Sequence, residues 1–140
     1  MENSLKVGCL KASLPEIRNF IWGRLEYVLL PDSEKNLIVL AIDEVCANLI
    51  VHSNKSNPKK SIEIEAGSNG NSFVCKIHDS GKKFDIVEYK TPAMEDLIKQ
   101  RRNGGIGLIL VKKIMDEIEL VSEGKKNIYV LSKTISRPVL

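Results

Sequence analysis

Three polar residues, Glu44, Asn48 and His52, recur every four positions inside the apolar segment 37–52. This spacing places them on one face of a predicted helix. Burying an unpaired amide costs about 2–7 kcal/mol, so such a stripe needs water or a partner. It is either the solvent-exposed side of the helix or a pocket wall. In a pocket, the Asn48 amide oxygen suits Mg²⁺, Glu44 suits proton acceptance, and His52 is a packed, hydrogen-bonded structural residue.

A second polar group follows a predicted strand, at His78, Asp79, Ser80 and Gly81. An aspartate next to a glycine at the end of a strand is commonly just turn chemistry. The functional alternative has Asp79 accepting a hydrogen bond from an amino group such as that of adenine. Gly81 would then let the base approach the backbone.

A third group, formed by Gly104, Gly105, Ile106 and Gly107, leads directly into an amphipathic segment. Glycines at the start of a helix expose backbone N–H groups to an anion, which the helix dipole also attracts. Arg101 and Arg102, just upstream, supply charge suited to phosphate. The pattern is neither a P-loop nor the G-x-G-x-x-G fingerprint, and a flexible loop tip is the alternative interpretation.

The elements that position these groups follow from periodicity and turn residues. A first strand is expected over 5–10, and a helix after Ser13 carries Glu16 as a capping box and ends at Pro31. A second helix begins at Asp32 or Ser33 and runs to about His52.

The second half of the chain predicts two hairpins around another helix. The composition of residues 53–60 predicts a loop, and residues 61–78 are predicted to form a hairpin that turns at Asn69 and Gly70. Residues 79–104 are predicted to be irregular, with at most a short helix near 94–101. A helix follows Gly105, with an apolar stripe at Leu108, Val111, Ile114, Met115 and Ile118. A closing hairpin joins 119–122 to 127–135. The order predicts an α+β fold, a two-layer α/β sandwich whose mixed, mostly antiparallel sheet is covered on one face by helices.

The bulk composition excludes several classes of protein. The 140 residues fit one domain spanning 1–140, with 43% apolar and 28% charged residues. A net charge of +3 is too mild to indicate direct nucleic-acid binding. The three cysteines lack the spacing of a disulfide framework or a zinc site. No run reaches the roughly 18 apolar residues of a membrane span, and no signal peptide is evident, so we expect a cytoplasmic protein without membrane contact.

Taken together, the three polar groups resemble the ATP-binding fold shared by histidine kinases and type II topoisomerases. The order is E-x-x-x-N on a long helix, D-x-G after a hairpin, and G-G-x-G-L before another helix. Within that superfamily the chain is most similar to the small serine kinases that act as anti-sigma factors. Segment 43–52 resembles their N box, and segments 78–85 and 104–117 resemble their two glycine boxes. The likeness extends over essentially the whole chain.

The resemblance implies a role for each matching residue. Asn48 would ligate Mg²⁺ and Glu44 would activate the attacking hydroxyl, while Asp79 would recognise adenine in a pocket shaped by Gly81. Gly104, Gly105 and Gly107, with Arg102 and Ile106, would line the phosphate side, and segment 86–104 would form the lid. Family members bind a sigma factor, phosphorylate a serine on an antagonist protein and commonly form homodimers.

The sequence departs from the family pattern at three places. Lys83 stands where the first glycine box usually has glycine, and Asn103 stands where the second often has arginine. Lys125, Lys126 and Asn127 replace the usual Thr or Ser before the last strand. These departures leave open a nucleotide-binding regulatory module that acts by partner contact with weak or no kinase activity. The ATP-binding half of a sensor histidine kinase working in trans is a third possibility.

Overall fold

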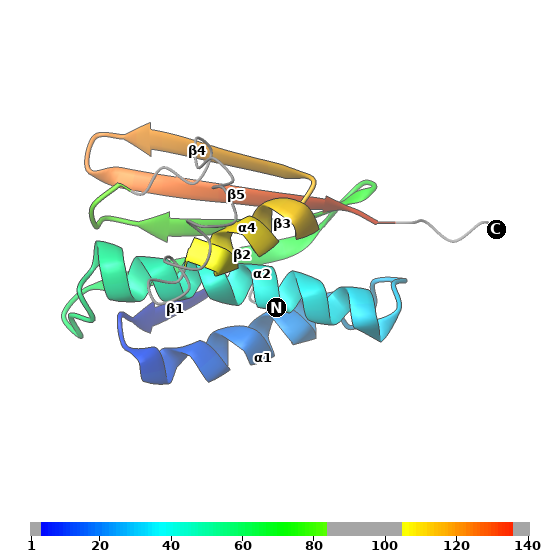
Figure 1. The fold of residues 1–140 in the computed structure, drawn as a ribbon, viewed down its shortest axis with the longest axis horizontal. Helices are drawn as coiled ribbons and strands as arrows, with labels where there is room; N and C mark the ends of the chain where they lie inside the picture. The colour runs from blue at the N-terminus through cyan, green and yellow to red at the C-terminus, as the bar shows by residue number, and fades with distance from the viewer. Residues whose placement is uncertain (1–3, 84–104, 136–140) are drawn as a thin grey trace.

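A computed structural model of the chain describes residues 4–83 and 105–135, which form two layers (Figure 1). One layer is a five-stranded sheet, and the other contains three α-helices that cover one of its faces. The strands are β1 (Ser4–Gly8), β2 (Ser61–Asn69), β3 (Ser72–Asp79), β4 (Glu117–Glu123) and β5 (Lys126–Thr134). The helices are α1 (Leu14–Leu25), α2 (Asp32–Asn48) and α4 (Gly105–Ile114), with a 3-10 turn η1 (Lys11–Ser13) and a π-helical turn η2 (Leu49–Ser53).

The strand order in the sheet is β1-β2-β3-β5-β4, and every neighbouring pair is antiparallel. The α+β sandwich predicted from sequence is therefore confirmed. The expected mixture of strand directions is not found among the described strands. Both hairpins turn where glycine permits a positive φ, at Gly70 (φ 64°) and Gly124 (φ 62°). Asp79 lies opposite Asn127 through the pairing of β3 with β5, two strands that neither turn joins.

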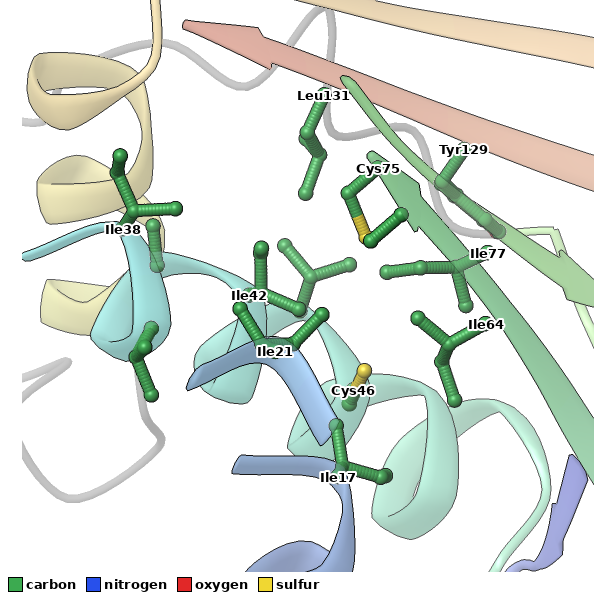
Figure 2. Close-up of a cluster of buried hydrophobic side chains, with 14 of the residues drawn as sticks. Ile17, Ile21, Ile38, Ile42, Cys46, Ile64, Cys75, Ile77, Tyr129 and Leu131 are labelled. Carbon is green, nitrogen blue, oxygen red and sulfur yellow. The ribbon is translucent and has the colours of Figure 1, made fainter. Parts of the chain in front are cut away.

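The core lies between the helices and the sheet and is mainly aliphatic (Figure 2). On β3, the side chains of Phe73, Cys75 and Ile77 face the helices, and the same alternation turns Asp79 inward at the end of the strand. All three cysteines are free and buried, as small hydrophobic residues are. Burial is the largest cause raising the pKa of each thiol.

Several expected helix boundaries differ from the structure. The Ser13 hydroxyl donates to the carbonyl of Gly8 (2.9 Å) and makes no capping bond to α1, so the predicted capping box does not form. Helix α1 ends at Leu25 rather than near Pro31. Pro31 precedes α2, which makes Asp32 its first helical residue and not its cap. Ile118 lies on β4 and not on the third helix, because α4 ends at Ile114.

The continuous helical stretch Asp32–Ser53 is long and apolar enough to cross a membrane by length and composition alone. Half of its most apolar window is nevertheless buried inside the protein. It lies between α1 and α4 in the helical layer, where Ile38, Ile42 and Cys46 point into the core (Figure 2). Its apolar character is explained by this packing.

Candidate functional site

Helix α2 carries the first part of the candidate site. Asn48 is 9% exposed, and its amide nitrogen donates to the backbone carbonyl of Glu44 at 2.7 Å. This bond fixes the orientation of the amide, so its oxygen is the atom left to bind a cation. Among the described residues, no cluster of three or more His, Cys, Asp or Glu side chains could hold a metal ion. A Mg²⁺ ion at Asn48 would therefore take most of its ligands from phosphate and water.

The two adjacent acids on α2 have different surroundings. Asp43 forms an ion pair with Arg18 of α1, with 2.9 Å between the guanidinium Nη1 and the carboxylate Oδ1. Glu44 points to the other side, toward α4. Burial, and secondarily the negative charge of Asp43, raise the pKa of Glu44 above its ordinary value. A carboxylate with a raised pKa is a stronger base than one with an ordinary pKa, and Glu44 has no ion pair among the described residues, so it is suited to accept a proton.

The structure brings Glu44 against Gly107 in the first turns of α4. A Cβ atom built on Gly107 would lie 2.6 Å from the carboxyl carbon of Glu44, which is too close for any real side chain. Glycine at position 107 thus lets the carboxylate lie directly on the backbone of α4. The sequence had suggested only a phosphate-facing role for this glycine.

The expected helical stripe breaks after Asn48. Residues 49–53 form the π-helical turn η2, which is wider than an α-helical turn and changes the phase of the following side chains. His52 is exposed there and is not the packed residue that the sequence had predicted.

Asp79 provides the second part of the site, at the end of β3. Its side chain is buried, with the residue 3% exposed, and its Oδ1 accepts a hydrogen bond from the Asn54 amide at 2.8 Å. Its Oδ2 is also buried and has no hydrogen-bond partner among the described residues. Buried polar atoms are nearly always paired, so this oxygen marks a place for a donor from outside the protein. The amino group of a purine base fits that requirement.

The glycine of the D-x-G turn is required by packing within the protein. A Cβ on Gly81 would lie 2.6 Å from Oδ1 of Asn54 and 2.8 Å from the carbonyl oxygen of Ser53. The Lys82 amide also donates to that carbonyl (3.3 Å). The turn after β3 is therefore pressed against the loop that follows α2. Glycine is therefore needed at position 81 for packing within the protein, whereas the sequence had suggested that it lets a base approach the backbone.

Two buried asparagines near Asp79 were not predicted from the sequence. Asn54 lies in the loop after η2, and Asn127 is the second residue of β5, opposite Asp79. The Asn127 amide nitrogen donates to the carbonyl of Gly81 (3.2 Å), and its oxygen accepts from the Ser122 hydroxyl (3.0 Å). The only sequence signal for Asn127 was its place before the last strand, where the family commonly has Thr or Ser.

The glycine-rich part of the site is only partly described. Gly105 and Ile106 form the first turn of α4, which confirms that a helix begins there. Arg102, Gly104, the lid over 86–104 and the short helix near 94–101 lie outside the described residues. The structure thus joins Glu44 and Gly107 at the α2–α4 contact, and Asn48 bonds the backbone of Glu44 one turn further along α2. Asp79 connects to the same helix through Asn54, whose amide also donates to the carbonyl of Leu49 (2.8 Å).

Residues 9–133 match the family described as the histidine kinase-like ATPase domain. The chain belongs to this family, and the resemblance inferred from its motifs is confirmed. Its relatives include the serine-protein kinase RsbW of Oceanobacillus iheyensis, 27% identical over 85 residues, which cover 58% of this chain and 54% of the relative. The anti-sigma F factor of Halalkalibacterium halodurans is 26% identical over 90 residues, 64% of this chain and 62% of the relative. The chain therefore matches little more than half the length of these relatives.

Two solved structures share the fold. The structure of the RsbU and RsbW domains of a Mycobacterium tuberculosis protein aligns with a TM-score of 0.66 at 17% identity, covering 98% of this chain and 34% of that one. The SiaB–SiaC complex of Pseudomonas aeruginosa aligns with a TM-score of 0.65 at 14% identity, covering 94% of this chain and 88% of that one. At these identities the likeness establishes the two-layer architecture.

Proposed function

We propose that this protein binds ATP with Mg²⁺ and transfers the terminal phosphoryl group to a serine of a partner protein. It acts in the cytoplasm as an anti-sigma factor that switches between a sigma factor and an antagonist, as a homodimer. The relatives named serine-protein kinase RsbW and anti-sigma F factor support this class of activity. The SiaB–SiaC complex supports the idea that a domain of this fold binds a partner protein.

The observation that carries the nucleotide part of the proposal is the buried, unpartnered Oδ2 of Asp79. Leaving a buried acceptor unsatisfied costs about 1–3 kcal/mol, so a ligand donor there would gain a corresponding amount. The 6-amino group of adenine is such a donor. The base would lie at the inward face of the sheet, near the end of β3.

The catalytic part of the proposal rests on α2. Bound Mg-ATP would supply the phosphoryl group together with a cation that neutralises its charge. Asn48 would bind the metal through its amide oxygen, and Glu44 would accept the proton of the serine hydroxyl. Phosphoryl transfer depends mostly on positioning and charge stabilisation, so few catalytic side chains are required, and a base and a metal ligand on one helix suit it.

Calorimetry with ADP and Mg²⁺ tests the nucleotide site directly. We expect the wild-type protein to bind and Asp79→Asn to bind at least about tenfold more weakly, as for the loss of a hydrogen bond to a charged group. Whichever way the new amide turns, its NH₂ group faces another amino group, either that of Asn54 or that of adenine. Asp116→Asn is the matched control, because Asp116 bonds Thr134 at the opposite end of the sheet. Equal binding by both variants would reject the site.

A second candidate function is a nucleotide-binding module that regulates a partner without transferring phosphate. Asn127 favours this second candidate. Both the nitrogen and the oxygen of its amide form hydrogen bonds within the protein, at a position where relatives commonly offer a hydroxyl to the nucleotide. Incubation with radiolabelled ATP and an antagonist-domain protein separates the two candidates. Label on a serine of the antagonist supports the kinase, whereas tight ADP binding without any transfer supports the module.

A further inference from the structure

Asn54 connects the end of the long helix to Asp79, 25 residues further along the chain. It is 4% exposed, and its side-chain nitrogen donates to the Leu49 carbonyl and to Oδ1 of Asp79, each at 2.8 Å. Both of these partners are acceptors, so only the NH₂ end of the amide can face them. A primary amide has two N–H groups, and both are used here. The side-chain amide of Asn54 therefore has a fixed orientation, with its NH₂ group toward Asp79.

This arrangement gives the two carboxylate oxygens of Asp79 different hydrogen-bonding states. The Asn54 donor occupies Oδ1, while Oδ2 remains buried without a partner among the described residues. The opposite end of the Asn54 amide is also constrained, since its oxygen packs where a Cβ on Gly81 would lie. Rotation of the carboxylate would break the bond to Asn54 and leave a buried N–H group unsatisfied. The carboxylate is therefore held with one acceptor committed and one available.

We infer that Asn54 is the positioning residue that makes the site select a 6-amino purine over a 6-oxo purine. This inference rests on the proposed function, in which a purine nucleotide binds at Asp79. A fixed acceptor oxygen takes a hydrogen bond from the amino group of adenine. It repels the carbonyl oxygen of hypoxanthine, because neither of these two oxygens carries a proton. A carboxylate freed from Asn54 can turn away from the base, which weakens its bond to the amino group of adenine and relieves its repulsion of the carbonyl of hypoxanthine.

Calorimetry with ADP and inosine diphosphate (IDP), both with Mg²⁺, measures this selectivity. We expect the wild-type protein to prefer ADP, and Asn54→Ala to lower the ratio of the two affinities at least about tenfold. Asn57→Ala is the matched control, since Asn57 lies in the same loop and its side chain bonds only the Lys59 amide among the described residues. It should leave the ratio unchanged. A folded Asn54→Ala protein with a wild-type ratio would overturn the inference.

A second measurement needs neither a variant of Asn54 nor a nucleotide. In the free wild-type protein, both side-chain amide protons of Asn54 should exchange with solvent at least about tenfold more slowly than those of Asn57, because each has a buried acceptor. Asp79→Ala should release one of them. Fast exchange of both protons in the wild-type protein would show that Asn54 does not hold Asp79 and would overturn the inference.

The outcomes separate this inference from the function on which it rests. If the wild-type protein binds neither nucleotide, the proposed function fails and the selectivity fails with it. If it binds ADP and IDP equally, the nucleotide site stands and the selectivity alone is rejected. Preference for ADP that depends on Asn54, together with protected amide protons, supports both.

Discussion

The carboxylate of Glu44 occupies the space in which residue 107 would carry its side chain. A Cβ on Gly107 would lie 2.6 Å from the carboxyl carbon and 3.2 Å from Cγ of Glu44. The contact joins the helix that carries the candidate base to the helix that follows the glycine-rich turn. Glycine at 107 is therefore needed for the position of Glu44, in addition to any role toward phosphate.

Gly107→Ala should lose the usual helical gain from alanine and destabilise the protein by up to about 1 kcal/mol, measured by urea unfolding, because the methyl group displaces the carboxylate at the end of the flexible Glu44 side chain. Gly23→Ala is the matched control. Gly23 lies in α1, and a Cβ there meets nothing within 4 Å, so alanine should stabilise the helix by about 0.5–1 kcal/mol.

A double-mutant cycle assigns the cost of Gly107→Ala to its cause. In a Glu44→Ala background the obstructing carboxylate is absent, and Gly107→Ala should become neutral or stabilising, as in an ordinary helix. If the costs of the two substitutions simply add, the contact between these residues does not determine the need for glycine.

Glu44→Ala should lower phosphoryl transfer to a serine substrate by at least about a hundredfold, the usual contribution of a general base. ADP affinity should change little, since Glu44 has no part in binding the base. Asp43→Asn is the control for a neighbouring acid, because the amide retains an oxygen that can accept from Arg18. Unchanged transfer by the Glu44→Ala protein would reject Glu44 as the base.

The raised pKa of Glu44 predicts a stability that depends on pH. Its pKa in the folded protein lies above the ordinary value of 4.5, so the folded state binds more protons between those two values. The contribution of Glu44 to stability therefore falls as the pH rises through this range. Glu44→Gln removes the charge and keeps the shape, so its melting temperature should exceed that of the wild-type protein at pH 7. The difference should shrink below pH 4.5, and a constant difference would contradict the shift.

The layered fold could be predicted because each signal for it was local. Apolar residues at a helical period marked the helices, and alternation with glycine turns marked both hairpins. The helix ends were less predictable. Ser13 has the sequence of a cap, yet its hydroxyl bonds Gly8, a partner that only the folded chain brings near. The π-helical turn after Asn48 had no recognisable signal, and it exposes His52.

The candidate site was predictable only where its residues lie on one element or in a compact motif. Glu44 and Asn48 share a helical face, and Asp79 follows a strand, so their spacing was visible in the sequence. Asn54 lies in a loop whose composition indicates only a turn. Its importance depends on a hydrogen bond across 25 positions. Asn127 likewise acquires its role through the pairing of β3 with β5, which determines that it faces Asp79.

Asn48→Ala should strongly reduce the effect of Mg²⁺ on nucleotide binding. In the wild-type protein, ADP should bind more tightly with Mg²⁺ than with EDTA, because the Asn48 oxygen supplies a ligand to the metal. Removing that ligand should lower the Mg²⁺-dependent gain at least about tenfold, since even outer-shell substitutions cost this much in metal affinity. Thermal unfolding controls for the loss of the bond from the Asn48 amide to the Glu44 carbonyl, which typically contributes about 1 kcal/mol. A folded Asn48→Ala protein that retains the full gain from Mg²⁺ would exclude Asn48 as a metal ligand, while leaving the recognition of adenine by Asp79 intact.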